Sequence, residues 1–120
     1  MRASLQKVLT EEAFLRIILL AERWSAGVRK AIVDFAIPWN VTRLGCGAEY
    51  LFTAQQPGIG SEAHAAMDFQ LRTGMHLYAM NRGILLTPFH NMALMSAATE
   101  PEDVDRHSTV FRDAVRELMA

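Results

Sequence analysis

The chain has few of the features that mark secreted, membrane-spanning or nucleic-acid-binding proteins. Cys46 is its only cysteine, so no disulfide can form within the chain, and a reducing cytoplasm is the expected compartment. The longest apolar runs, such as residues 17–21, are far too short to span a bilayer. Twelve basic and 13 acidic residues nearly cancel and are interspersed along the chain. We therefore expect neither a nucleic acid nor a membrane as a partner.

What the chain does have is enough apolar residues for one core. Its 120 residues suit a single domain, and 51% of them are hydrophobic. No internal repeat or low-complexity tract divides the sequence, and it gives no sign of a second domain. We therefore treat residues 1–120 as one domain.

The first half of the chain predicts a long helix followed by two strands. Residues 2–8 have the pattern of a helix end, and Thr10 suits the start of the next helix because its hydroxyl can accept an unpaired backbone N–H. This helix should end before Pro38, which cannot continue it. Strands are predicted at Trp39–Leu44 and Ala48–Thr53, with a glycine-rich turn between them. The helix places its apolar residues on one face: Phe14, Ile17, Ala21, Trp24, Val28, Ala31 and Phe35.

The second half predicts a loop, a helix and a buried strand. Residues 55–66 carry proline and glycines and are expected to form a loop. A helix should then run from a cap at Asp68 to about Arg82, and Gly83 suits the left-handed position that ends many helices. The continuous apolar run Ile84–Thr87 fits a short buried strand.

Two further elements complete the expected architecture. Ala93–Ser96 is predicted to form another short strand, and Thr99 and Glu102 have the spacing of a capping box for the last helix. That helix places four apolar residues on one face: Val104, Phe111, Val115 and Leu118. The predicted order is α-β-β-α-β-β-α, an α+β fold in which helices cover one face of a small, mostly antiparallel sheet.

The four histidines do not form a metal or catalytic set. No two of His64, His76, His90 and His107 stand three to five residues apart, and no cysteine or carboxylate completes a ligand set, so we expect no metal site. His107 is expected at the edge of the core, whereas His64 and His76 are expected to be solvated. Cys46 stands between two glycines and is interpreted as a small residue tolerated in a tight turn, because an exposed thiol is activated only by a nearby base, cation or helix N-terminus.

His90 and Asn91 are the strongest candidates for a binding site. They follow a predicted buried strand and Pro88, at the strand exit, where α/β and α+β proteins commonly present polar groups to a ligand. The alternative is a polar turn without a function, and the two residues alone do not decide between these. By contrast, residues 58–61 lack the glycine fingerprint and the strand-to-helix context of a phosphate-binding loop.

A series of short motifs, taken in order and spacing, covers nearly the whole chain. They are Thr42–Gly45 with Ala48–Tyr50, Leu77–Tyr78 leading into Asn81–Gly83, Leu86–Met92, and Val104–Arg106. Together they resemble the C-terminal end of the class III aminotransferases, the pyridoxal-phosphate-dependent family that includes glutamate-1-semialdehyde aminomutase. The stretch Leu86–Met92 is the most specific of them. The resemblance implies the fold of an aminotransferase small domain and, for intact members, a homodimer.

The resemblance also implies what this chain lacks. Family members hold pyridoxal phosphate covalently on a lysine of a separate large domain, and the cofactor supplies the electron sink. Only Lys7 and Lys30 occur here, and both lie outside the matching motifs. We therefore assign no catalytic and no cofactor-binding residue, and we expect the chain alone not to transaminate. Its expected partner is the large cofactor-binding domain of the same enzyme or the second subunit of a homodimer.

By the same resemblance, the chain would close over the cofactor site and help to shape substrate choice. In the mutase branch of the family a glutamate of the matching loop reaches the substrate side. Asn91 stands at that position here, with His90 beside it. Because an amide cannot carry a negative charge or accept a proton as a carboxylate can, the difference argues against semialdehyde mutase activity and for a related transaminase with another substrate.

The alternative is a protein of another class, a stand-alone interaction or ligand-binding module derived from that domain. Such a module would keep the small-domain fold and reuse its apolar surface for a partner or for self-association. A stand-alone small enzyme has little support, because no nucleophile–base pair, paired carboxylates or metal set is visible.

Overall fold

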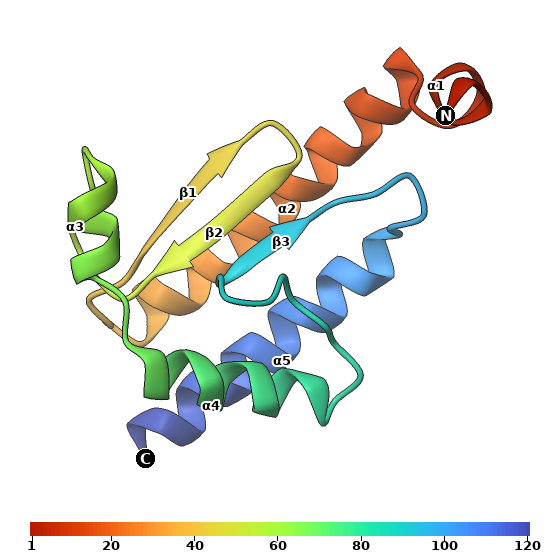
Figure 1. The fold of residues 1–120 in the computed structure, drawn as a ribbon. Coiled ribbons are helices and arrows are strands. Elements are labelled where there is room, and N and C mark those ends of the chain that lie inside the picture. The colour runs from red at the N-terminus through yellow and green to blue at the C-terminus, as the bar shows by residue number, and fades with distance from the viewer.

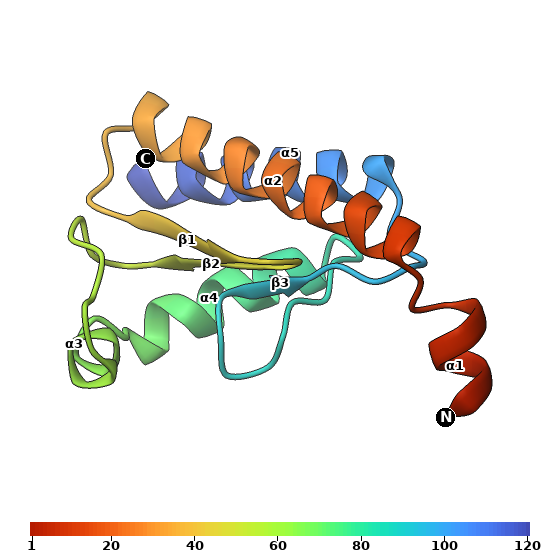
Figure 2. The ribbon, with the colours of Figure 1, turned by 90° about the horizontal axis from the view of Figure 1, so that it is seen from above.

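The computed structural model describes all 120 residues, and these form five helices and three strands. In chain order the elements are α1 (Arg2–Lys7), α2 (Glu11–Asp34), β1 (Asn40–Leu44), β2 (Gly47–Leu51), α3 (Gly60–Ala65), α4 (Phe69–Met80), β3 (Met92–Leu94) and α5 (Pro101–Met119). The strands form one antiparallel sheet in the order β1-β2-β3 (Figure 1). The long helices α2 and α5 lie side by side against one of its faces (Figure 2), and α4 packs against α5. None of the helices is both long enough and apolar enough to cross a membrane.

The α+β class with an antiparallel sheet is confirmed, but the sheet has three strands rather than four. The prediction of a strand at Ile84–Thr87 is wrong, because this extended segment makes a single backbone hydrogen bond to β3, from Thr87 N to Met92 O at 3.1 Å. Only Leu86 of the segment is buried, so a longer pairing with β3 would gain little stabilisation from apolar burial. The last strand covers Met92–Leu94 instead of Ala93–Ser96, and part of the expected loop at residues 55–66 forms α3.

The register of the sheet assigns alternate residues to its two faces. Tyr50 pairs with Val41, and Ala48 pairs with both Arg43 and Ala93; of these, Ala48, Tyr50 and Ala93 are buried beneath α2 and α5. The intervening residues face the other way, away from α2 and α5 (Figure 2). We call this surface the open face; its residues are Asn40, Thr42, Leu44, Gly47, Glu49, Leu51, Met92 and Leu94.

A cluster of aromatic side chains joins both long helices to the sheet. Tyr50 of β2 lies between Trp24 of α2 and Trp39, with ring centroids 6.2 and 6.0 Å away, and Phe111 of α5 meets the same ring at 4.9 Å. His107 lies against Trp24 and is buried, although it was expected at the edge of the core. Burial lowers the pKa of the His107 imidazole to about 4, so this side chain is neutral at neutral pH.

The two long helices approach each other closely at one point. Gly27 of α2 faces Ser108 of α5, and a Cβ atom at Gly27 would collide with the Ser108 side chain. Nearby, Arg23 forms two hydrogen bonds of 2.7 Å with the carboxylate of Asp105. Glycine at position 27 therefore allows the two helices to share one face of a sheet that has only three strands.

Three predicted helix ends are confirmed. Thr10 and Asp68 each accept the backbone N–H three residues on, at 3.2 and 2.9 Å. Gly83 has a φ of +79°, and the N–H groups of Gly83 and Ile84 each bond to a carbonyl of α4 at 3.0 Å, which is the Schellman arrangement. Ala36 ends α2 in the same manner with a φ of +52°, a left-handed conformation that costs a non-glycine residue about 1 kcal/mol.

The capping box of α5 lies one residue later than predicted. It is formed by Glu100 and Asp103, not by Thr99 and Glu102. The side chain of Glu100 accepts a hydrogen bond from the backbone N–H of Asp103, and the side chain of Asp103 accepts one from the backbone N–H of Glu100. Pro101 takes the first helical position, which suits proline because its missing N–H would have no partner inside the helix.

We predict that Ala36→Gly stabilises the chain by about 0.5–1 kcal/mol, because glycine adopts a left-handed conformation without steric cost. The matched control is Ala26→Gly, at an exposed position inside α2, which should destabilise by about 1 kcal/mol. Urea unfolding followed by circular dichroism measures both. Equal destabilisation by the two substitutions would contradict the assigned end of α2.

Candidate functional site

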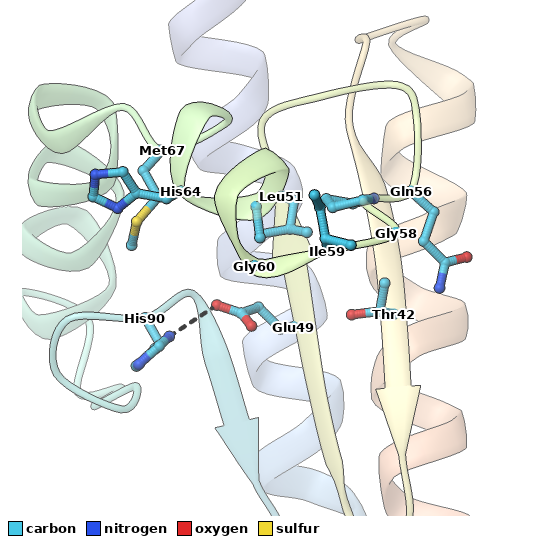
Figure 3. A pocket seen from close by; sticks show the side chains of 12 residues that line it. Thr42, Glu49, Leu51, Gln56, Gly58, Ile59, Gly60, His64, Met67 and His90 are labelled. Carbon is cyan, nitrogen blue, oxygen red and sulfur yellow. Dashed lines mark hydrogen bonds and ion pairs between the residues drawn. The ribbon is translucent and has the colours of Figure 1, made fainter.

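The open face of the sheet carries a hollow of about 570 Å³. Thr42, Glu49 and Leu51 line it from the strands, residues 56–67 around α3 form a wall, and His90 closes the side toward β3 (Figure 3). Its size lies within the range of small-molecule binding sites. It lies on the face of the sheet that α2 and α5 leave uncovered (Figure 2).

Glu49 and His90 are joined at the β3 side of the hollow. Glu49 Oε1 lies 3.3 Å from His90 Nδ1 (Figure 3). The side chain of Glu49 keeps 22% of its surface exposed and that of His90 keeps 49%, so both are within reach of a molecule in the hollow. Nδ1 of His90 faces the carboxylate. The other ring nitrogen, Nε2, has no hydrogen-bond partner within the chain, so it is available to a ligand.

A tight turn holds His90 in this position. His90 N bonds to Thr87 O at 3.3 Å, Pro88 follows Thr87, and Phe89 has a φ of +66°. This is the type II pattern, in which the third residue is usually glycine because it must be left-handed. A bulky residue there stores strain, and Arg72 of α4 supports the turn by donating to Phe89 O at 2.8 Å.

Asn91, the other predicted site residue, does not line the hollow but a smaller cavity beside it, which shares Glu49 and His90 with the hollow. Only 5% of its surface is exposed, and its Oδ1 has no hydrogen-bond partner. Its backbone carbonyl accepts from Tyr50 N at 3.2 Å, which continues the pairing of β2 with β3. His90 therefore lines the hollow, whereas the side chain of Asn91 is buried beside it. That both residues line a substrate site stays a prediction.

Two titratable residues that line the hollow were not predicted as site residues. Glu49 had a signal in the sequence, because the alternation along β2 sets it opposite the buried Ala48 and Tyr50. His64 is exposed, as expected, but it also lines the hollow, and nothing local predicted this because α3 itself was not predicted. His76 of α4 is half-buried rather than solvated. No group of three His, Cys, Asp or Glu side chains is close enough to hold a metal ion.

Comparison with known proteins gives a structural match but no matching protein-family model. The crystal structure of a glutamate-1-semialdehyde-aminomutase from Pseudomonas aeruginosa PAO1 matches 98% of this chain at 47% sequence identity, with a TM-score of 0.95, and a variant of it in complex with PMP matches equally well. The predicted resemblance to the class III aminotransferases is confirmed. It spans about a quarter of the length of the Pseudomonas structure, 26%.

More distant aminotransferases share the fold alone. An omega-transaminase from Sphaerobacter thermophilus matches 93% of this chain at 22% identity, with a TM-score of 0.76, and the chain covers 26% of it. A transaminase with PLP bound matches 92% at 20% identity, with a TM-score of 0.71, and the chain covers 24% of it. The small α+β fold is therefore retained while the sequence of this part of the aminotransferases diverges widely.

The hollow does not by itself fit the aminotransferase cofactor. No lysine or arginine lines it. Lys30 pairs with Asp34 on α2 at 3.2 Å, and Lys7 is exposed at the end of α1, so neither lysine is at the open face. The backbone N–H of Gly58 donates to the Glu62 carboxylate at 2.8 Å and is not available to a phosphate. The residues of this chain therefore supply neither a covalent attachment point nor a phosphate site in the hollow.

We predict that Phe89→Gly leaves the free energy of unfolding unchanged or raises it by up to about 1 kcal/mol, because strain at a left-handed residue is relieved. The loss of the phenyl ring costs little, since 77% of Phe89 is exposed. Phe89→Val is the matched control and should destabilise by about 1 kcal/mol, because a β-branched residue is worse at positive φ. Thermal unfolding of both variants tests this, and a similar loss of stability in both would show that the turn is not strained.

Proposed function

We propose that this chain is the small C-terminal domain of a class III, pyridoxal-phosphate-dependent transaminase or aminomutase-like enzyme. It would form the lid and the substrate side of an active site whose catalytic lysine lies in another domain. The observation that carries this proposal is the division of the sheet into a buried face and an open face with a polar hollow. The 47% identity to an aminomutase over 98% of the chain supports it.

The open face has the properties expected of a surface that closes over a site. Leu44 and Leu94 are 90% and 60% exposed there, which suits contact with the remainder of an enzyme or with the second subunit of a dimer. Closure would remove water from the hollow and strengthen the polar contacts of Glu49 and His90 with a substrate. The cofactor supplies the electron sink when bound, and this chain would contribute binding, orientation and the exclusion of water.

Within the substrate side we assign different roles to the two predicted residues. His90 would contact the substrate through Nε2 while Glu49 holds its ring in orientation. Asn91 would not contact the substrate, because its side chain is buried. It would hold the turn in place through its backbone carbonyl, which accepts a hydrogen bond from β2.

A chimera tests the proposal directly. The matching quarter of the Pseudomonas aminomutase is replaced by this 120-residue chain, and the control is the same enzyme with that quarter deleted. We predict that the chimera binds pyridoxal phosphate and shows the cofactor absorbance change with at least one amino donor, whereas the deletion does not. A folded chimera that fails to bind the cofactor would contradict the proposal.

The isolated chain provides the complementary test. After incubation with pyridoxal phosphate and reduction with borohydride, mass spectrometry should show no stoichiometric adduct, because neither Lys7 nor Lys30 lies at the open face. One adduct per chain at either lysine, accompanied by turnover of an amino donor, would show that the chain carries its own active site.

The second candidate function is a stand-alone interaction or ligand-binding module. The exposed leucines of the open face favour it as well, because such a surface can serve self-association or a dedicated partner. Size measurement at several concentrations separates the two. A discrete, concentration-independent oligomer of the isolated chain favours the module, whereas non-specific association favours a domain that lacks its enzyme.

A further inference from the structure

The hollow on the open face carries one formal charge, and this charge is negative. Glu49 is the only acidic or basic side chain among the residues that line it, apart from His64 and His90. No lysine or arginine lines the hollow to offset this carboxylate. The sign of this charge constrains which ligands can enter.

The nearby groups that could bind an anion have partners elsewhere. Arg43 on β1 donates to the Glu22 carboxylate of α2 at 3.0 Å, on the covered side of the sheet. Arg72 donates one N–H to Phe89 O at 2.8 Å and lines the smaller cavity beside the hollow, not the hollow itself. The N–H of Gly58, which lines the hollow, is bonded to a carboxylate of α3. A ligand carboxylate would therefore enter the hollow without a counter-charge among its lining residues, at a desolvation cost.

Glu49, by contrast, can accept further hydrogen bonds. A carboxylate offers about four lone-pair sites, and the structure uses one of them, for His90. A primary ammonium group has three N–H donors and is the simplest group that satisfies such an acceptor. The side chains of Leu51, Ile59 and Met67 add apolar walls that suit a chain of methylene groups.

We infer that the hollow binds the cationic end of an aliphatic amine and rejects a carboxylate. This inference rests on the proposed function, within which the bound group is the end of the substrate remote from the reacting centre. Glu49 pairs with the ammonium group, His90 completes its hydrogen bonds, and residues around α3 contact the methylene chain. The ligand is thus a diamine or another amine with a second, distant cationic group.

Three probes of equal length and different charge test this on the isolated chain. They are 1,5-diaminopentane, glutarate and 1,5-pentanediol, titrated at pH 8 up to about 50 mM while backbone amide resonances are followed by NMR. We predict saturable shifts for the diamine at residues 49–51, 58–64 and 90. The diol should bind at least about threefold more weakly, and glutarate should give no shifts at these positions.

Matched variants identify the charge that is responsible. Glu49→Gln should weaken diamine binding about threefold or more, and Glu49→Asp, which keeps the charge, should bind more tightly than Glu49→Gln. Glu22→Gln removes a carboxylate from the covered side of the same sheet and should leave binding within a factor of about two. The inference is overturned if glutarate binds as well as the diamine, if the diamine gives no saturable shifts at these residues, or if Glu49→Gln binds like the wild type.

This test and the test of the proposed function fail independently. Diamine binding needs no cofactor and no second domain, so it can succeed in a chain whose chimera is inactive. An active chimera combined with a chain that ignores the diamine would retain the proposed function and overturn the ligand class. The dispersion of the NMR spectrum of each variant shows whether it is folded before any affinity is compared.

Discussion

The fold depends on the burial of one face of a three-stranded sheet under α2 and α5. Tyr50 is the centre of this contact, since it meets Trp24, Trp39 and Phe111 with ring centroids 4.9–6.2 Å away. A sheet of this size cannot bury both faces with two helices on the same side. The residues between those of the core are therefore directed away from it, and Glu49 reaches the open face because Ala48 and Tyr50 are buried.

Two adjacent residues before β3 have different environments. Asn91 continues the pairing of β2 with β3 and has a buried side chain, whereas His90 is exposed and lines the hollow. The turn at Phe89, which is left-handed and accepts a hydrogen bond from Arg72, directly precedes both residues. Backbone strain of this kind persists where the surrounding structure fixes it, commonly next to binding sites.

Local signals in the sequence predicted the features that depend on local chemistry. The caps at Thr10 and Asp68, the left-handed Gly83 and most of the apolar face of α2 follow from spacing and side-chain type alone, although Phe14, predicted on that face, is exposed. The strand predicted at Ile84–Thr87 was wrong because pairing depends on a partner that the run itself does not specify. The pairing of Glu49 with His90 joins residues 41 positions apart, so no local pattern could reveal it.

The account as a whole claims that the open face, and not the outer side of the helices, meets the rest of an aminotransferase. Methyl-labelled chain, alone and within the Pseudomonas chimera, can be compared by solvent paramagnetic relaxation in NMR. The account predicts that the methyl groups of Leu44 and Leu94 become protected from solvent in the chimera, while that of Val33, exposed on α2, stays accessible. The account would be contradicted if the methyl groups of Val33 became protected from solvent in the chimera while those of Leu44 and Leu94 stayed exposed.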